Sequence, residues 1–186
     1  MQEWWERHFV LLIESGMNAG VIDDLLAKSP KILRDGACDF LDFLASRNIP
    51  ILIFSAGIGN LIRGILAQED RMTSNVHILS NTFIFDADGR VTGFENEPIH
   101  MMNKSTTRIT DRYKTFVASR KNVILLGDSL GDLDMVDDRD MHTIIRIGFL
   151  NENIEKNLDL YKNKFDIVIT HDGSMDSIHA LLCNIA

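Results

Sequence analysis

In the segment NVILLGDSLGDLDMV, residues 122–136, an apolar run leads into the acidic residues Asp128 and Asp132. The run ends in Gly127, Asp128 comes next, and Asp132 follows four positions later. A carboxylate at the carboxyl end of a buried strand suits a hard cation such as Mg²⁺, which takes oxygen ligands and keeps waters that a phosphate can replace. Asp132, one helical turn further on, could orient a neighbouring cation or a metal-bound water. Taken alone, a strand-end aspartate is also an ordinary helix N-cap.

A second apolar run, ILIFSAG at residues 51–57, ends in groups that could hold an oxyanion. It provides the Ser55 hydroxyl and the backbone amides of Ala56 and Gly57, a combination that can cradle a phosphate. In an open parallel sheet, ligands bind beyond the carboxyl ends of the strands. The sequence therefore predicts a phosphate and metal site at the strand ends that carry Ser55 and Asp128.

The elements that must position these residues alternate between helical and extended patterns. Apolar spacing predicts helices over 2–15, 21–29, 38–48, 59–69, 104–120, 153–165 and 174–185. Apolar, β-branched runs predict strands over 49–57, 122–129, 142–149 and 165–170. Two extended runs within 75–94 surround the turn residues Asp86–Gly89, which predicts a β-hairpin. The alternation predicts an α/β fold with a parallel sheet and helices on both faces.

The composition is that of a globular domain. The chain has 186 residues, 45% of them hydrophobic and 25% charged, and its formal net charge is −8. An acidic chain without a basic patch gives no reason to expect nucleic acid or an anionic membrane as a partner. The two cysteines, Cys38 and Cys183, have no metal-binding spacing, so we expect reduced thiols and a cytoplasmic location. No signal peptide or membrane-spanning segment is expected from the pattern of apolar residues.

Taken in order, these segments resemble the haloacid dehalogenase (HAD) superfamily of phosphotransferases. FSAG resembles its second motif, in which a strand-end Ser or Thr, here Ser55, holds the phosphoryl group. Lys104 in MMNKST resembles the third, a lysine that neutralises the nucleophile and the phosphate. GDSLGD resembles the fourth, with Asp128 on Mg²⁺ and Asp132 in support. The resemblance implies a Rossmann-like three-layer core with a parallel sheet, plus part of a helical cap.

Longer phrases narrow the resemblance to the cytosolic 5'-nucleotidase III family, the pyrimidine 5'-nucleotidases. They are EWW, IPILIFSAGIGN, FDADGRVTGF, IHMMNK, NVILLGDSLGDLDM, IGFLNENIE and DIVI. The resemblance implies Mg²⁺-dependent hydrolysis of nucleoside 5'-monophosphates, pyrimidine nucleotides or 7-methylguanosine monophosphate, to nucleoside and phosphate through an aspartyl-phosphate. It also implies a partial helical cap over residues 1–35 and a phosphatase core over 36–186, with a β-hairpin near 81–95.

One part of the family pattern is absent ahead of Trp4. Family members begin with a strand ending in Asp-x-Asp-x-Thr, whose first Asp attacks phosphorus and whose second is the general acid and base. We expect an incomplete sequence rather than a natural, inactive short form. Asp86 and Asp88 do not replace the motif, because they follow the second motif and read as a hairpin turn. In the resembling superfamily, the first-motif strand lies between the strands that carry motifs two and four. Without it, the strands predicted over 49–57 and 122–129 would each have an unpaired edge, which favours self-association.

The substrate base is expected at the first predicted helix. By resemblance, Trp5 falls where the cap contacts the nucleobase, and aromatic side chains stack on bases. A tryptophan there resembles the branch that accepts 7-methylguanosine monophosphate more than the strictly pyrimidine branch. His8 matches a substrate-contacting position, although the family has a different residue type there. The alternative for Trp4 and Trp5 is packing of the helix onto the core.

Two other functions are compatible with parts of the sequence. GDSL names a serine esterase family, in which Ser129 would be the nucleophile, His179 the base and Asp176 the orienting acid. Against this, the block lies far from the N-terminus and the family's oxyanion donors have no counterpart. The other alternative is a non-catalytic protein that binds a nucleotide or phosphate and lacks the nucleophile.

Overall fold

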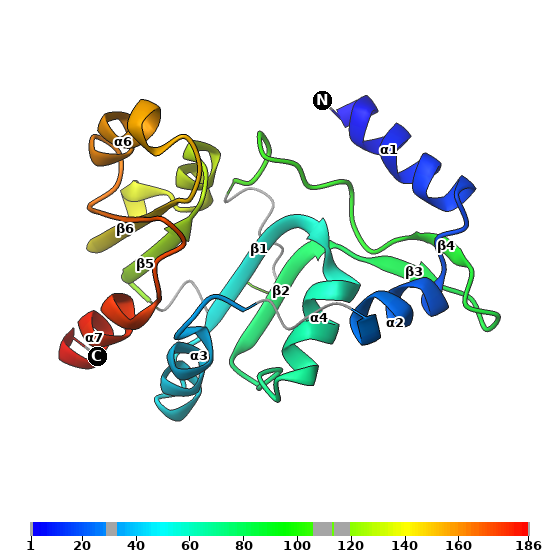
Figure 1. Cartoon of the computed structure of the whole chain (residues 1–186), viewed down its shortest axis with the longest axis horizontal. Coiled ribbons are helices and arrows are strands. Elements are labelled where there is room, and N and C mark those ends of the chain that lie inside the picture. The colour runs from blue at the N-terminus through cyan, green and yellow to red at the C-terminus, as the bar shows by residue number, and fades with distance from the viewer. Residues whose placement is uncertain (1, 29–32, 106–112, 114–119, 186) are drawn as a thin grey trace. The chain divides into compact units, whose positions relative to one another are not determined.

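The computed structural model describes residues 2–28, 33–105, 113 and 120–185 (Figure 1). The chain divides into two compact units, which we call unit 1 (Met1–Leu33 and Leu41–Met102) and unit 2 (Arg34–Phe40 and Asn103–Ala186). The helix predicted over 104–120 falls almost wholly outside the described residues. The division into a cap over 1–35 and a core over 36–186 stays a prediction, because it concerns functional parts rather than compact units.

The centre of unit 1 is a parallel pair of strands, β1 (Ile51–Ile58) and β2 (Val76–Asn81), with helix α4 (Gly59–Gln68) packed against both (Figure 1). The β-branched and leucine side chains of these strands favour extended backbone. Pairing is regular from Ile51 opposite Val76 to Phe54 opposite Leu79. The next pair is Ile58 with Asn81, so β1 bulges over residues 55–57.

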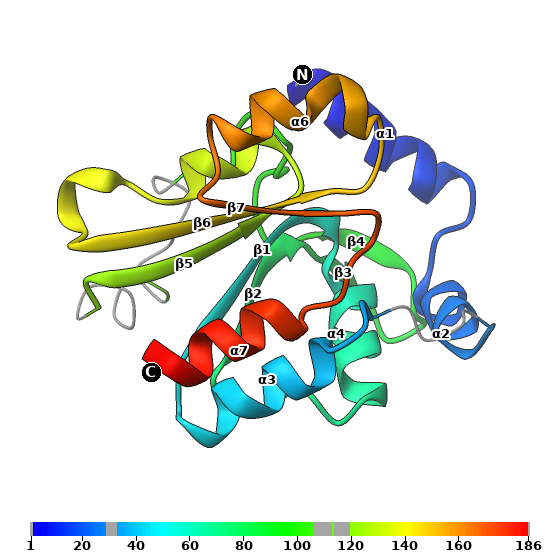
Figure 2. The ribbon, with the colours of Figure 1, turned by 60° about the vertical axis from the view of Figure 1, so that its left-hand side comes forward.

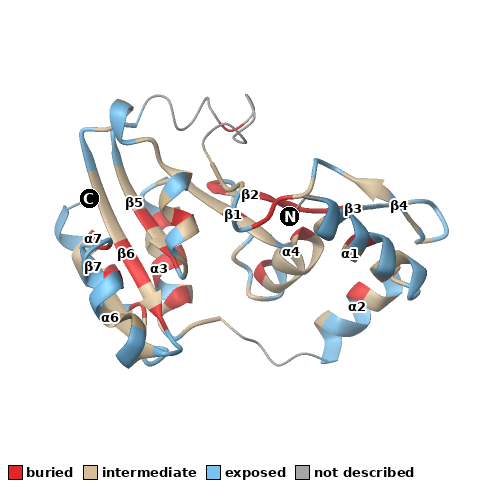
Figure 3. Ribbon diagram, turned by 90° about the horizontal axis from the view of Figure 1, so that it is seen from above, coloured by how far each residue is buried: buried red, intermediate tan, exposed pale blue. Residues whose placement is uncertain are grey.

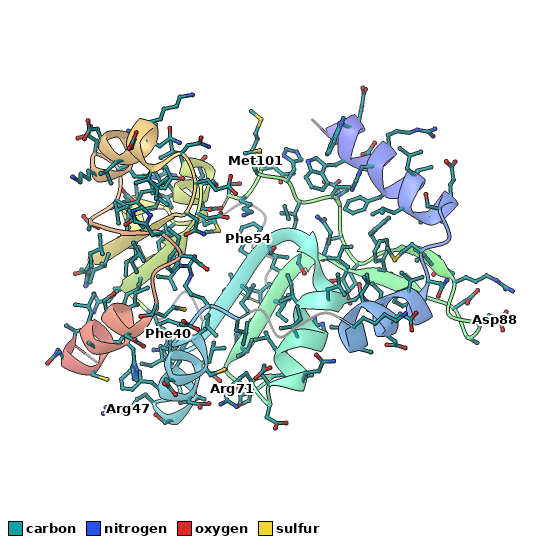
Figure 4. All side chains as sticks on the ribbon, viewed as in Figure 1. Phe40, Arg47, Phe54, Arg71, Asp88 and Met101 are labelled. Atoms are coloured by element: carbon teal, nitrogen blue, oxygen red, sulfur yellow. The ribbon has the colours of Figure 1, made fainter. Side chains whose placement is uncertain are left out.

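A β-hairpin follows in unit 1, formed by β3 (Phe83–Phe85) and β4 (Val91–Phe94). The Asp86 side chain accepts hydrogen bonds from the amides of Asp88 and Arg90, and Gly89 has the positive φ that the turn needs. Asp88 lies at the hairpin tip (Figure 4). The first extended run predicted from the sequence is therefore two strands, since β2 pairs with β1 and only β3 joins the hairpin.

Besides α4, the described part of unit 1 contains helices α1 (Gln2–Glu14) and α2 (Ala19–Lys28) and most of α3 (Ala37–Ser46), which begins in unit 2. Helix α1 is anchored by Phe9, which is 3% exposed. The Phe9 ring centroid lies 4.6 Å from that of Phe94 and 6.2 Å from that of Phe83. The apolar side of α1 therefore packs on the hairpin.

Unit 2 is built on a three-stranded parallel sheet in the order β5-β6-β7, with β5 Asn122–Gly127, β6 Thr143–Leu150 and β7 Ile167–Thr170. Helices α6 (Ile154–Lys162) and α7 (Asp176–Ile185) lie on opposite faces of the sheet (Figures 1 and 2). Two 3₁₀-helices, η2 (Leu130–Met135) and η3 (Asp138–Asp140), connect β5 to β6. The buried residues of β5 and β6 lie in the carboxyl-terminal halves of the two strands (Figure 3). The predicted α/β class with parallel strands is confirmed.

Candidate functional site

The predicted acidic pair lies where β5 runs into η2. One carboxylate oxygen of Asp132, Oδ2, accepts hydrogen bonds from the amides of Asp128 and Ser129 and from the Ser129 hydroxyl, each 3.0 Å long. The other, Oδ1, accepts from Lys104 Nζ at 2.8 Å. Asp132 is 2% exposed, so these donors replace water. Asp132 therefore organises the turn and holds Lys104, and both of its oxygens are already engaged.

Gly127 makes this turn possible. A Cβ placed on Gly127 would lie 2.6 Å from Cβ of Asp132 and 3.0 Å from its Oδ2, closer than packed atoms come. The glycine at the end of β5 is therefore required by the close approach of a buried carboxylate. The sequence predicted a helical turn between Asp128 and Asp132, where the structure has a 3₁₀-helix.

The charges of this cluster are unevenly distributed. Burial and the Asp132 charge raise the pKa of Asp128 above its ordinary value, although Lys104 opposes the rise. Burial also acts to raise the pKa of Asp132, but the Lys104 ammonium and the hydrogen bonds from Ser129 outweigh burial and lower it. Asp132 thus holds its negative charge, while the Asp128 carboxylate gains from any additional cation nearby.

Tyr161 completes the cluster from α6 and was not predicted. Its hydroxyl donates to the backbone carbonyl of Asp128 at 2.6 Å. Burial, followed by the charges of Asp128 and Asp132, raises the pKa of Tyr161, so the hydroxyl keeps its proton. The ring packs with Phe165 and Leu150 in the core of unit 2. Its only signal in the sequence is a tyrosine on a helix face, whose hydroxyl needs a partner when buried.

The predicted phosphate cradle lies at the bulge of β1 in unit 1, just after Phe54 (Figure 4). The Gly57 amide donates to Ser55 Oγ at 3.0 Å, which leaves the Ser55 hydroxyl proton free to donate elsewhere. Asn81, another residue that was not predicted, donates from Nδ2 to the Ala56 carbonyl at 2.7 Å. The cradle therefore combines an exposed residue, Gly57, with the buried Asn81 side chain that holds the neighbouring Ala56 carbonyl.

The aromatic residues of α1 form a contiguous cluster in unit 1. Trp4 and His8 stack with their planes 5° apart and their centroids 5.3 Å apart. Trp5 meets His8 edge to face at 5.8 Å. Trp4 is 58% exposed, whereas the Trp5 indole nitrogen is buried and has no hydrogen-bond partner among the described residues. The sequence placed Trp5 and His8 near the base; which ring would meet a ligand stays a prediction.

The structure groups the predicted residues in two places. Unit 2 brings together Lys104, Asp128 and Asp132, and unit 1 holds the remaining ones, Ser55, Ala56, Gly57, Trp5 and His8. Asp128 offers the hard oxygen donors that suit Mg²⁺. Within the described residues, no three His, Cys, Asp or Glu side chains form a metal cluster, so Asp128 fits as one ligand of a cation rather than as a complete site.

The residues of the esterase hypothesis are used structurally. The Ser129 hydroxyl donates to Asp132, and Asp176 accepts from the Ser174 hydroxyl at 2.8 Å. No observation favours this hypothesis, which stays a prediction. Across the described helices, none combines the length and apolar character that crossing a membrane requires.

Comparison with known proteins relates the whole chain to one family. The family "Pyrimidine 5'-nucleotidase (UMPH-1)" matches residues 1–186. The 7-methylguanosine phosphate-specific 5'-nucleotidases of Mus musculus and Homo sapiens are 36% and 37% identical over 187 residues. Each match takes in 100% of this chain and 62% of the relative, so the chain spans less than two thirds of the length of these relatives.

Two solved structures share the fold. Cytosolic 5'-nucleotidase IIIB bound to cytidine superposes with a TM-score of 0.75 at 38% identity, over 81% of this chain and 51% of that one. A phosphoserine phosphohydrolase-like protein from Francisella tularensis superposes with a TM-score of 0.63 at 16% identity, over 100% of this chain and 77% of that one. The second likeness concerns the fold alone. Together they confirm the HAD-like fold expected from the sequence.

Proposed function

The chain belongs to the pyrimidine 5'-nucleotidase (UMPH-1) family, and we propose that it is the part of a 5'-nucleotidase that binds the phosphoryl group of a nucleoside 5'-monophosphate. The reaction is hydrolysis to nucleoside and phosphate. The observation that carries this proposal is the Lys104–Asp132 pair beside Asp128. A lysine that is 13% exposed, held at 2.8 Å by a carboxylate, is a fixed cation suited to an anionic ligand.

Each site residue has a distinct role in this proposal. The Ser55 hydroxyl and the amides of Ala56 and Gly57 bind phosphoryl oxygens, which carry the negative charge of the substrate. Lys104 neutralises that charge, and Asp132 holds Lys104 in place. Asp128 would hold a divalent cation, for which we propose Mg²⁺; when bound, the cation would add positive charge at the phosphoryl group.

The attacking carboxylate is the part of the chemistry that these residues do not supply. None of the 186 residues forms the Asp-x-Asp-x-Thr motif whose first Asp attacks phosphorus in the resembling family. Asp86 begins the similar sequence Asp-Ala-Asp, but its carboxylate accepts the hydrogen bonds from the amides of Asp88 and Arg90 that form the hairpin turn. We therefore propose that turnover requires a segment with this motif in addition to these residues.

The base of the substrate is proposed to lie at α1, on the cluster of Trp4, Trp5 and His8. The Mus musculus relative is named for 7-methylguanosine phosphate, and cytosolic 5'-nucleotidase IIIB was solved with cytidine. A methylated, cationic base gains most from stacking on an electron-rich indole. We accordingly propose 7-methylguanosine monophosphate and pyrimidine monophosphates as substrates, in the cytoplasm.

Phosphate release from CMP, UMP and 7-methylguanosine monophosphate tests the proposal. The 186-residue chain is assayed with Mg²⁺, alone and carrying an added N-terminal Asp-x-Asp-x-Thr strand. We expect turnover only with the added strand. In that extended chain, Asp128→Asn should lower turnover by at least about 100-fold, because the charge stabilisation that the metal supports is removed. Asp134→Asn, which changes an exposed acid on the 3₁₀-helix that follows Asp128, is the control and should remain active.

The remaining outcomes decide between alternatives. Binding of the nucleotides without turnover, even with the added strand, would favour the non-catalytic protein. Turnover by the 186 residues alone that survives in Asp128→Asn would contradict the proposed roles of both Asp128 and the additional segment.

A further inference from the structure

The carboxyl-terminal end of β1 departs from regular pairing with β2. After Phe54 opposite Leu79, the next paired residues are Ile58 and Asn81, so four steps along β1 match two along β2. Residues 55–57 have no paired residue in the register of β1 with β2. The regular ladder with β2 therefore no longer fixes the directions of these peptide groups, and the Gly57 amide turns to Ser55 Oγ.

The Asn81 side chain replaces the missing ladder contact. Its Nδ2 donates to the Ala56 carbonyl at 2.7 Å and to the Ile99 carbonyl at 2.9 Å. Its Oδ1 accepts from the Ile99 amide at 2.8 Å. Asn81 is 4% exposed, so no water can take over these bonds without a rearrangement. Both protons of the amide are thus committed to holding two backbone segments.

The contact with Ala56 fixes the peptide group that orients the Ser55 hydroxyl. The Ala56 carbonyl and the Gly57 N–H belong to one planar peptide unit, so holding the oxygen fixes the N–H. That N–H donates to Ser55 Oγ at 3.0 Å, which in turn leaves the Ser55 proton directed elsewhere. We infer that Asn81 is a positioning residue that sets the Ser55–Gly57 bulge for a phosphoryl group. This inference rests on the proposed function.

The second contact ties in the segment that leads to Lys104. Ile99 is 1% exposed, and both of its backbone polar groups are bound by the single Asn81 amide. Lys104 follows Ile99 by five positions in the chain. One buried side chain therefore fixes the phosphate cradle directly and also anchors the start of the segment that carries the proposed phosphate-neutralising lysine.

The test replaces Asn81 with a group of the same shape that cannot donate. Asn81→Asp puts a carboxylate oxygen against the carbonyls of Ala56 and Ile99. The matched control is Asn75→Asp, in the turn immediately before β2. Asn75 is 6% exposed, and its Nδ2 likewise donates to a backbone carbonyl, that of Ile49, at 2.8 Å. Both variants therefore lose a buried donor, but only one of them touches the bulge.

Two readouts are taken on the folded chain by amide NMR. Without ligand, we expect the Gly57 amide resonance to move in Asn81→Asp and to stay in Asn75→Asp. Titration with inorganic phosphate, followed at the Ala56 and Gly57 amides, should show binding weakened about tenfold or more in Asn81→Asp and less than about twofold in Asn75→Asp, the scale expected for a lost buried hydrogen bond. Asn81→Ser, which leaves room for a water, provides the same test if Asn81→Asp does not fold.

The outcomes separate this inference from the function on which it rests. An unmoved Gly57 resonance and unchanged phosphate affinity in folded Asn81→Asp or Asn81→Ser would overturn the positioning role. Equal weakening in Asn75→Asp would overturn it too, because general loss of stability would then explain the effect. If the wild-type chain binds no phosphate while Gly57 still responds to Asn81 alone, the positioning role stands and the proposed phosphate site is overturned.

Discussion

At the scale of single residues, Asp132 carries the most concentrated set of contacts. Its carboxylate accepts from two amides, a hydroxyl and Lys104 while being almost wholly buried. Asp132→Asn would leave the Lys104 cation without its counter-charge, and we expect a loss of about 2–4 kcal/mol in the free energy of unfolding. Urea denaturation measures this. Asp137→Asn, which removes a pair with an exposed Arg139, should leave the free energy of unfolding nearly unchanged, because water screens exposed ion pairs.

Asp132→Asn should also change how the free energy of unfolding depends on pH. The folded-state pKa of Asp132 lies below its ordinary value of 3.8, because Lys104 and Ser129 outweigh burial. A depressed carboxyl pKa stabilises the folded state above the unfolded pKa, and the gain is lost as the pH falls through the folded pKa. The difference in stability between wild type and Asp132→Asn should therefore shrink below about pH 4. A difference that stays constant down to acid unfolding would contradict the ionised pair.

Tyr161 is a second residue whose effect can be isolated. Tyr161→Phe removes the 2.6 Å hydrogen bond to the Asp128 carbonyl and keeps the ring in its apolar contacts. We expect a loss of about 1–2 kcal/mol in the free energy of unfolding, because the carbonyl is left without this donor. We also expect Mg²⁺, titrated against the Asp128 and Ser129 amide resonances, to bind several-fold more weakly. Unchanged Mg²⁺ binding would limit Tyr161 to a role in stability.

At the scale of elements, the junction of β5 and η2 depends on the lack of a side chain at Gly127. Gly127→Ala should push Asp132 out of its place, because the added carbon would lie 2.6 Å from the Asp132 Cβ. We expect a loss of about 1–3 kcal/mol and a shift of the Ser129 amide resonance. Gly93→Ala in β4, where an added carbon meets nothing within 4 Å, should leave stability unchanged or slightly raised.

The same junction illustrates what sequence reasoning can reach. An apolar run that ends in Gly-Asp predicted β5 and placed Asp128 at its end, because a buried strand leaves a local pattern in the sequence. The 3₁₀-helix was not predicted, because the local capping contacts of Asp132 suit an α-helical turn equally well and its bond to Lys104 is tertiary. Asn81 and Tyr161 were missed for the same reason: neither lies in a motif, and their roles arise from backbone groups of other segments. The break between β2 and β3 likewise follows from the choice of partner strands.

At the scale of the whole molecule, the two strands that lead to site residues, β1 and β5, each have only one partner strand within the described part of the chain. There, β1 pairs with β2, and β5 pairs with β6. An open strand edge presents unpaired N–H and C=O groups and is a template for another strand. The self-association predicted from the sequence therefore has two candidate surfaces, one in each unit, and either can be tested without reference to the other.

Hydrogen exchange along β1 provides the sharpest test of an open edge. The Ile51 amide donates to the Asn75 carbonyl, so by strand alternation the Ile53 amide also faces β2, whereas those of Leu52 and Phe54 face the other side. At low protein concentration, Leu52 and Phe54 should exchange at least about tenfold faster than Ile51 and Ile53. As the concentration rises, their protection should increase together with a larger sedimenting species. Equal protection of all four amides in the dilute chain would mean that another segment covers the edge, and a monomer at every concentration would exclude association through it.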